Sequence, residues 1–194
     1  MRITADPSTS PDDYEFCHQV RVRFAETDAM GIVHHSRYLP IMEEARVEYL
    51  RDIDHPYQTV REDGFDFTVL EVSVQYRQPI RFDEVVDVHL SLSRVDRASF
   101  QMAYLLVVED EVRAVGVTAH GCITSADGKP TRLPAWLPSF TRHASARGSW
   151  VESMFMEAGY GLASSSSKRS GPFRSPDLVN RIPRFVAIII DEHN

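Results

Sequence analysis

Hydrophobic and polar residues alternate along five stretches of the chain, and a period of two is typical of strands with one buried face. In the first stretch, residues 16–24, Phe16, Val20 and Phe24 fall on one side. Pro79, Glu109-Asp-Glu111 and Asp127-Gly-Lys-Pro130 mark turns that end later strands. The other four predicted strands cover residues 67–78, 86–92, 99–108 and 112–124. Short turns between these four predict an antiparallel meander, which the first strand must join.

A helical spacing replaces the alternation over residues 37–52. Apolar residues recur three and four positions apart on one side, at Tyr38, Ile41, Met42, Ala45, Tyr49 and Leu50. Pro40 falls within the first turn, where its missing N–H costs nothing, and Ser36 is a plausible N-cap. One long helix followed by strands predicts an α+β fold, with the helix on one face of a sheet.

Composition changes at both ends of the chain. Residues 1–14 are polar and acidic, with Pro7 and Pro11, and are expected to form a flexible N-terminal arm. Residues 15–138 carry all the periodic segments and are expected to form one domain. Residues 139–194 contain a serine run at 164–167 and have the composition of a linker. We expect this extension to be largely disordered, with at most a short helix at 150–156 and a short strand at 185–190.

Charge and cysteine content exclude several classes of protein. The net charge of −7, without a basic stripe over residues 1–140, argues against nucleic acid as the main partner. The N-terminus lacks the plan of a signal peptide, and the apolar run at 185–190 is too short to span a bilayer. These features predict a cytoplasmic protein. Cys17 and Cys122 give no disulfide framework, and both are expected to be buried free thiols.

The candidate chemistry lies between the first strand and the helix. Asp28 on a turn, the imidazoles of His34 and His35, and a helix N-terminus that favours negative charge occur within eleven residues. This combination predicts a catalytic site. Plainer roles remain open, because Asp28 could cap its turn, His35 could be a solvated or capping residue, and Tyr38 could belong to the core. Adjacent histidines rarely reach one ion, so we expect no metal.

The segment Thr27-Asp-Ala-Met-Gly-Ile-Val-His-His-Ser-Arg-Tyr38 with Glu43-Glu-Ala-Arg46 resembles the signature of hotdog-fold acyl-CoA thioesterases. It is similar to the 4-hydroxybenzoyl-CoA thioesterase branch, and more closely to its YbgC-type bacterial enzymes. Matching residues continue through Tyr76-Arg-Gln-Pro79, Asp83, Arg97-Ala-Ser-Phe100 and Gly128-Lys-Pro-Thr-Arg-Leu-Pro134. The resemblance covers roughly residues 16–138. It implies one long helix wrapped by a curved antiparallel sheet of about five strands.

The resemblance also implies roles for individual residues. Asp28 matches the aspartate that acts as nucleophile or general base, and His35 matches the position whose amide, imidazole or both assist catalysis. Tyr38 matches the tyrosine at the helix start. Gly31, Val33 and His34 are expected to contact substrate, Gly31 through a positive φ or a close approach. Candidates for the CoA phosphates are Arg77, Arg81, Arg94 and Arg97.

The resemblance implies hydrolysis of an acyl-CoA, or of an acyl carrier protein thioester, without a cofactor, in a homodimer or homotetramer with active sites at the subunit interface. Two alternatives remain. A hotdog enoyl-CoA hydratase resembles an Asp-x4-His arrangement, whereas His34 and His35 follow Asp28 after five and six residues. A non-enzymatic acyl-binding or carrier-protein interaction module would not need the carboxylate. Chain length and aromatic preference of the acyl group are left open.

Overall fold

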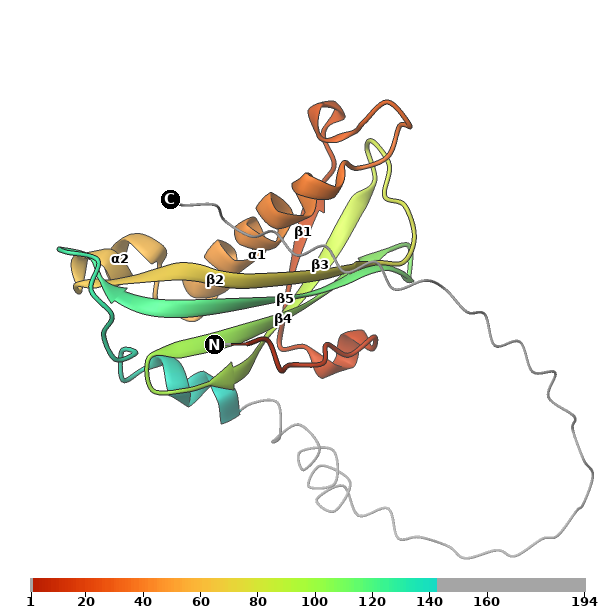
Figure 1. Ribbon diagram of the computed structural model, residues 1–194. Helices are drawn as coiled ribbons and strands as arrows, with labels where there is room; N and C mark the ends of the chain where they lie inside the picture. Colours follow the sequence, from red (N-terminus) through yellow and green to blue (C-terminus); the bar gives the residue numbers. More distant parts are fainter. Residues whose placement is uncertain (1, 143–194) are drawn as a thin grey trace, which may run out of the picture. The chain divides into compact units, whose positions relative to one another are not determined.

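Five antiparallel strands form one sheet, and the long helix α1 (Tyr38–Asp52) lies on one face of it (Figure 1). The structure is a computed structural model and describes residues 2–142. Short helical turns are η1 (Pro11–Asp13), η2 (Phe24–Glu26), η3 (His35–Arg37), α2 (Tyr57–Glu62) and η4 (Leu137–Arg142). The strands are β1 (Phe16–Arg21), β2 (Phe65–Tyr76), β3 (Val85–Val95), β4 (Ser99–Val108) and β5 (Glu111–Thr124). The expected α+β hotdog architecture is confirmed.

The strand order, β1-β3-β4-β5-β2, corrects the predicted meander. Only β3, β4 and β5 follow one another as neighbours, whereas β2 pairs with β5, from Phe65↔Thr124 to Tyr76↔Ala114. The segment after β2 therefore crosses from one edge of the sheet to the other. It is held there because Val33 N–H donates to the Ile80 carbonyl at 2.8 Å and Val22 N–H to that of Glu84 at 2.9 Å. This crossing brings the end of β2 close to the loop that carries Asp28.

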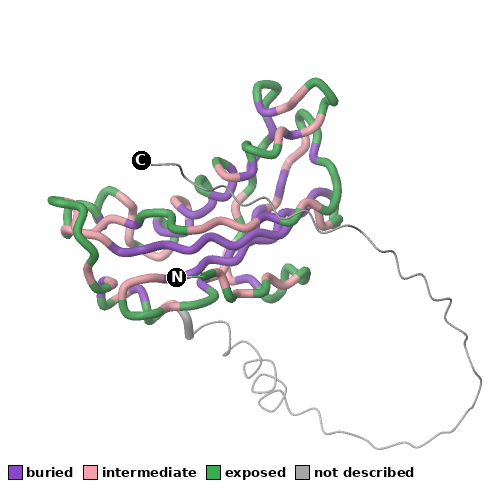
Figure 2. The backbone as a smooth tube through the Cα atoms, viewed as in Figure 1, coloured by how far each residue is buried: buried purple, intermediate pink, exposed green. Residues whose placement is uncertain are grey.

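The core lies between α1 and the inner face of the sheet. Alternate residues of β3, including Val86, Val88 and Leu90, are fully buried there. The neighbouring strands β4 and β5 are buried almost continuously, as the purple of the central strands shows (Figure 2). Gly116 of β5 leaves room for Met42, because a Cβ at residue 116 would lie 2.7 Å from the Met42 sulfur. Burial of each large apolar side chain stabilises the fold by roughly 1.5–3 kcal/mol. The helix is thereby fixed to the sheet along most of its length.

Two turns at the strand ends show why particular residues occupy them. Glu109 and Asp110 join β4 to β5 with φ of 50° and 63°, which is the two-residue hairpin geometry that matches strand twist. Gly128, in the turn after β5, has a φ of 69°. The charged hairpin predicted at Glu109-Asp-Glu111 is confirmed.

Several finer predictions were wrong. Cys17 is exposed, because the odd positions of β1 face away from α1, whereas Cys122 is buried as expected. Ser36 does not cap α1, since its hydroxyl and its N–H both contact the His34 ring. The helix α2 was missed because six residues carry too little periodicity. The short helix and strand expected at 150–156 and 185–190 lie outside the described residues.

The segment predicted to be a flexible arm lies on the outer face of the sheet, opposite α1 (Figure 1). Ile3, Thr4 and Ala5 donate backbone hydrogen bonds to side chains of β2 and β4. At the other end, Leu137 is buried in the core and Phe140 packs against it. The flexibility of the arm stays a prediction. Of the extension predicted to be disordered, residues 139–194, only 139–142 are described, and they belong to η4, whereas the rest lies outside the described residues. No helix in the described part of the chain has the length and apolar character needed to cross a membrane.

Candidate active site

Asp28 lies in a narrow loop that the backbone closes at both sides. Thr27 and Val33 pair across the loop, and Asp28 N–H donates to the Ile32 carbonyl at 2.9 Å. Gly31 N–H donates to the Asp28 carbonyl at 2.9 Å, and the φ of Gly31 is +73°. The predicted need for positive φ at residue 31 is confirmed. The loop position of Asp28 is thus set by backbone bonds and one glycine.

The two oxygens of the Asp28 carboxylate differ in their hydrogen bonds. Oδ1 accepts a hydrogen bond from the Met30 N–H at 2.8 Å, which is the turn-capping role considered from the sequence. Within the described residues Oδ2 has no hydrogen-bond donor. The side chain is half-buried, and it contributes to the lining of a cavity. One oxygen therefore fixes the carboxylate while the other is available for chemistry.

His34 and His35 adopt different roles at the start of the helix. The His34 ring caps the turn η3, because its Nδ1 lies 2.9 Å from the Ser36 hydroxyl and accepts from the Ser36 N–H at 3.3 Å. The His35 ring lies 4.0 Å from the His34 ring, measured between centroids, and contributes to the cavity. As the first residue of the turn, His35 has no intrahelical acceptor for its N–H. No other backbone acceptor in residues 2–142 receives that N–H.

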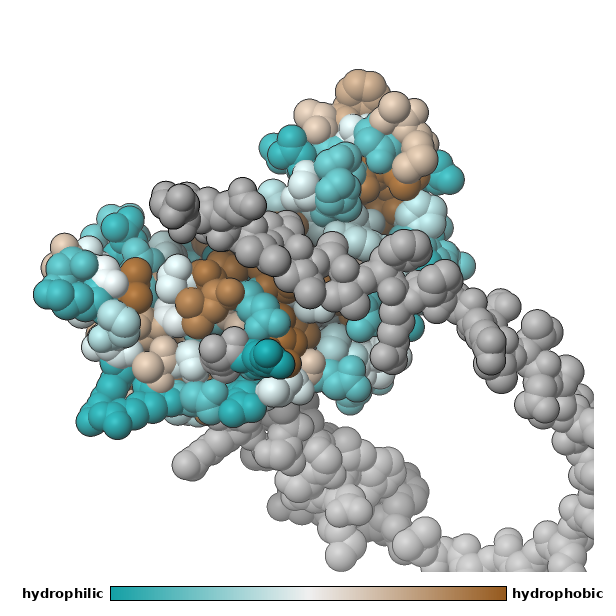
Figure 3. Space-filling model, in the orientation of Figure 1, coloured by the Kyte–Doolittle hydropathy of each residue, from teal (hydrophilic) through white to brown (hydrophobic). Residues whose placement is uncertain are grey.

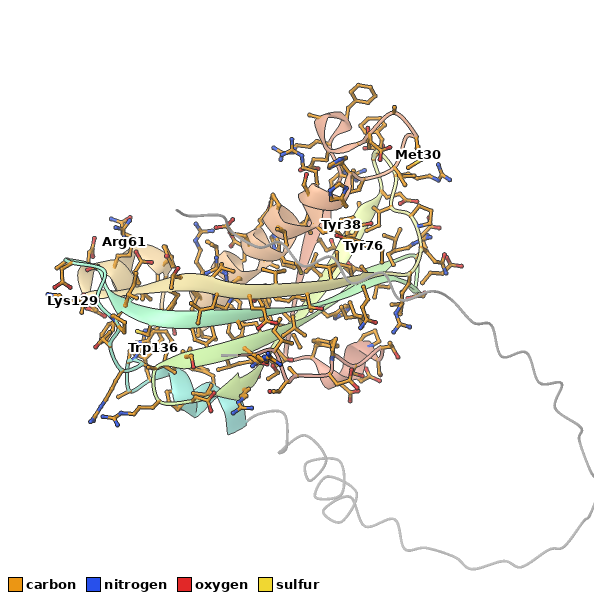
Figure 4. The ribbon with its side chains drawn as sticks, viewed as in Figure 1. Met30, Tyr38, Arg61, Tyr76, Lys129 and Trp136 are labelled. Carbon is orange, nitrogen blue, oxygen red and sulfur yellow. The ribbon has the colours of Figure 1, made fainter. Side chains whose placement is uncertain are left out.

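A cavity of about 420 Å³ opens between this loop, the start of α1 and the end of β2. Its floor is aromatic, since the rings of Tyr38 and Tyr76 meet edge to face at 4.8 Å (Figure 4). Tyr76 O–H donates to the His35 carbonyl at 3.3 Å, which ties β2 to the helix start. The cavity is lined by Asp28, Met30, Ile32, Val33, His35, Tyr38, Tyr76, Arg77, Gln78 and Pro79.

Burial makes the Tyr38 phenol harder to ionise. The side chain is 3% exposed, and burial, followed by the nearby Tyr76, raises the pKa of Tyr38 to about 12. The phenol, which is protonated at neutral pH in any case, thus stays protonated into the alkaline range and can donate or accept a hydrogen bond. It supplies a polar edge in an otherwise apolar floor, and it is also part of the core, so both roles considered from the sequence are compatible with its position.

Exposed apolar side chains occur close in sequence to the Asp28 loop and before β3, and one of them, Met30, lines the cavity. Phe24, Met30 and Phe82 are 76%, 73% and 53% exposed, and the rings of Phe24 and Phe82 meet edge to face at 5.7 Å. Hydrophobic surface gathers over this tip in the space-filling view (Figure 3). An exposed apolar cluster beside a cavity is typical of a surface that a ligand or partner covers.

The structure brings together four of the six site residues predicted from the sequence, namely Asp28, Val33, His35 and Tyr38. Gly31 shapes the loop and His34 caps the turn, but neither lines the cavity. Of the arginine candidates only Arg77 lines it, whereas Arg94 pairs with Asp96 at 3.1 Å. Sequence reasoning assigned no site role to Tyr76 or Gln78, although both stand beside Pro79, where the chain leaves the sheet.

The helix carboxylates lie away from the cavity lining. Glu43 contacts Arg46 at 3.5 Å, and Glu44 contacts His18 at 3.1 Å, so both carboxylates take part in contacts along the helix surface. Residues 2–142 contain no group of three or more metal-ligating side chains that could hold an ion. The cavity therefore combines a fixed carboxylate, a helix-start amide and an aromatic floor, which together suit attack on a carbonyl carbon.

The comparisons with known proteins agree with this geometry. Acyl-CoA thioesterase YbgC of Haemophilus influenzae is 29% identical over 68% of this chain and 97% of its own. The crystal structure of a hypothetical protein from Aquifex aeolicus is 36% identical, with a TM-score of 0.63 over 66% of this chain and 100% of its own. That of a DHNA-CoA thioesterase from Staphylococcus aureus is 27% identical, with a TM-score of 0.60 over 75% and 95%.

The fold has the arrangement expected of the hotdog family, and the similar proteins include ones named as thioesterases. The model of the thioesterase-like superfamily matches residues 22–141, which includes the Asp28 loop, α1 and all of the sheet except β1. The chain belongs to the thioesterase-like superfamily.

Proposed function

We propose that this protein is an acyl-CoA thioesterase that hydrolyses an acyl-CoA to a free carboxylic acid and CoA. One observation carries the proposal: the Asp28 carboxylate and the helix-start residue His35 line the same cavity, above an aromatic floor. Relatives named as acyl-CoA and DHNA-CoA thioesterases support the substrate class. A binding module would have no use for a carboxylate whose Oδ2 is left without a donor.

Asp28 is proposed to act on the reacting water, or on the thioester itself, through Oδ2. As a general base it takes a proton from water while the water oxygen attacks the carbonyl carbon. As a nucleophile it forms an anhydride with the acyl group, which water then hydrolyses. In both cases the carbon–sulfur bond breaks and the CoA thiolate takes up a proton. Oδ1 stays bound to the Met30 N–H, so the carboxylate keeps its orientation throughout.

The oxyanion formed on attack is proposed to accept from the His35 N–H. This group has no acceptor in its own helix, and the helix macrodipole adds positive potential at the same end. A fixed donor of this kind lowers a barrier by about 3–4 kcal/mol. Tyr38, protonated at neutral pH, is proposed to orient the acyl group from the floor. Arg77, exposed at the cavity rim, is the leading candidate to pair with a CoA phosphate.

The active unit is proposed to be a homodimer paired along β2, with a homotetramer as the alternative. β2 is the edge strand beyond β5 and is twelve residues long, whereas the other edge strand, β1, has six. Val69 and Leu70 on β2 are 50% and 51% exposed. A long apolar edge invites pairing with another strand. Pairing here would extend the sheet beside the cavity, whose lining includes the end of β2.

Thiol release from short, long and aromatic acyl-CoAs tests the proposal, with wild type beside Asp28→Asn. The amide keeps the bond to Met30 N–H but cannot take a proton, so kcat should fall by about 10²–10⁴-fold at unchanged Tm. Asp110→Asn, in the hairpin between β4 and β5, is the matched control. Turnover that survives in Asp28→Asn would reject the role of Asp28. Absence of wild-type turnover on CoA esters, with turnover of acyl carrier protein esters, would reassign the substrate.

A further inference from the structure

Tyr76, at the end of β2, contacts the helix start that carries the proposed oxyanion donor. Its O–H donates to the His35 carbonyl at 3.3 Å, and its ring meets the ring of Tyr38 edge to face at 4.8 Å (Figure 4). Hydrogen bonds in active sites are often long before a substrate binds. Burial raises the pKa of Tyr76, so the hydroxyl keeps its donor proton at neutral pH. One side chain thus bonds a strand of the sheet to the turn η3.

The peptide groups on both sides of the His35 Cα are held by hydrogen bonds. The His34 carbonyl accepts from the Arg37 N–H at 2.8 Å. Because a peptide group is planar and trans, this bond also sets the direction of the His35 N–H. The next peptide group joins the His35 carbonyl to the Ser36 N–H, which donates to the His34 ring at 3.3 Å. Tyr76 bonds the carbonyl of that second group from outside the helix start.

The end of β2 is itself fixed to β5. The N–H groups of Arg77 and Gln78 both donate to the Arg113 carbonyl, at 2.8 and 3.1 Å. The Arg113 guanidinium also donates to the Gln78 side-chain oxygen at 3.0 Å. Backbone and side chain of one β5 residue therefore hold the two residues after Tyr76, so the hydroxyl extends from a fixed point.

The segment that begins at Tyr76 bonds to both reactive parts of the site. Its first residue reaches the His35 carbonyl, and four residues later the Ile80 carbonyl accepts from the Val33 N–H at 2.8 Å. Val33 closes the loop that carries Asp28. Residues 76–80 therefore connect the proposed donor to the loop of the carboxylate, and Tyr76 is their contact on the donor side.

We propose that Tyr76 is a positioning residue, which keeps the His35 N–H in the place that the reaction needs relative to Asp28. This rests on the proposed function, because it assigns that N–H to the oxyanion. Attack on a carbonyl carbon requires the attacking oxygen and the oxyanion donor at fixed places around one carbon atom. A displacement of about 1 Å in such a site can lower the rate by about 10²-fold. The Tyr76 hydroxyl acts through the His35 carbonyl and does not touch the reacting atoms.

Tyr76→Phe tests this in acyl-CoA hydrolysis, because it keeps the ring against Tyr38 and removes only the hydroxyl. We expect kcat to fall by about 5- to 50-fold, less than the roughly 10²–10³-fold loss for a deleted oxyanion donor, because the N–H is displaced and not removed. KM should stay within about twofold, since contacts in the ground state are kept.

Tyr14→Phe is the matched control and should keep the kcat of wild type. The Tyr14 O–H also donates to a backbone carbonyl, that of Ser8 at 2.7 Å, and Tyr14 does not line the cavity. A loss of kcat in Tyr76→Phe alone therefore reports the place of the bond and not the loss of a tyrosine hydroxyl in general.

The pH profile of kcat separates positioning from acid catalysis. A positioning hydroxyl does not exchange protons with the substrate, so Tyr76→Phe should lower kcat by the same factor at every pH. If wild type loses activity at alkaline pH and Tyr76→Phe does not, the hydroxyl is the acid that protonates the leaving thiolate, and the positioning role is overturned.

Carbon NMR tests the contact without turnover. The ¹³C resonance of the His35 carbonyl should move in Tyr76→Phe and stay in place in Tyr14→Phe, and an unmoved resonance overturns the proposal. Equal kcat in the two variants, while Asp28→Asn is inactive, also overturns it and leaves the proposed function intact. A wild type without turnover on any thioester would reject the proposed function, and the role of Tyr76 with it, so the wild-type assay tells the two failures apart.

Discussion

Polar side chains lie near both ends of α1, but their surroundings differ. At the N-terminal end, Asp28 and His35 face a cavity and keep an unused oxygen and an unused N–H. Toward the C-terminal end, Arg46 and His120 are at most 6% exposed, and Thr118 lies 2.7 Å from the His120 ring. The first end has free hydrogen-bonding groups that face a cavity. The second keeps its polar side chains inside the core, where Arg46 Nη1 and His120 Nδ1 have no hydrogen-bond partner among the described residues.

At the second end, burial changes the pKa of a histidine. His120 stacks on Phe100 with 4.8 Å between ring centroids, and its Nδ1 has no partner in the described part of the chain. Burial, followed by the charge of Arg46, lowers the pKa of His120 to about 3. His120 is therefore a neutral core residue at physiological pH. Polar groups beside the same helix are available for a reaction where a cavity reaches them, and they are packed into the core where none does.

The largest effect should come from His120. Its folded pKa of about 3 lies below the ordinary value of 6.5, so its contribution to stability is present above pH 6.5 and is lost as pH falls toward 3. Between pH 6.5 and 3.5 this loss is on the order of 4 kcal/mol. His120→Gln should flatten that part of the curve of unfolding free energy against pH, measured by denaturant titration. His18→Gln, on β1, is the control, and an equal slope in His120→Gln and wild type would contradict the assignment.

Alanine substitutions at two glycines should have a smaller effect, and they separate the geometry of the Asp28 loop from the stability of the fold. Gly31 and Gly128 both have positive φ, +73° and +69°, and a Cβ on either would meet no atom within 4 Å. Alanine at either position should cost about 1 kcal/mol through backbone strain alone. Only Gly31→Ala should also lower kcat/KM, because it moves the loop that orients Asp28. Equal activity losses in the two variants would mean that the loop has no special role.

The smallest effect should come from His35→Ala. The substitution keeps the backbone N–H and removes only an exposed ring that lies tilted against the His34 ring. If the amide is the oxyanion donor, kcat should change much less than in Asp28→Asn, and stability should change by about 0.5 kcal/mol or less, as for an ordinary surface site. A loss as large as that of Asp28→Asn would assign the imidazole a direct part in the reaction.

Periodicity predicted most of the fold because it reports which face of an element is buried. It gave the α1 boundary within one residue and all five strands. It could not report which strands pair, so β2 was placed beside β3 instead of β5. The exposure of Cys17 was missed for a related reason, since alternation does not say which face of β1 meets the core.

In the candidate site, too, the sequence predicted what is local in the chain and missed what depends on tertiary structure. Asp28, His35 and Tyr38 come from one continuous segment and could be named from the sequence. Tyr76 and Gln78 reach the cavity only because the chain crosses the sheet after β2, which is a tertiary event. The role of His34 also needed the structure, because a ring that caps a turn looks like a substrate contact in a motif. The positive φ of Gly31 could be predicted, but not that this residue lies outside the cavity lining.

The contact between Gly116 and Met42 constrains how this sequence can be varied. The Met42 sulfur lies 2.7 Å from the place that a Cβ of residue 116 would take, so the two side chains compete for one volume. A library that randomises residue 116 alone should return almost only glycine, whereas one that varies both positions should recover pairs of constant total volume, with a smaller residue at 42 beside alanine at 116. Residue 42 of the helix and residue 116 of the sheet should therefore change together rather than independently.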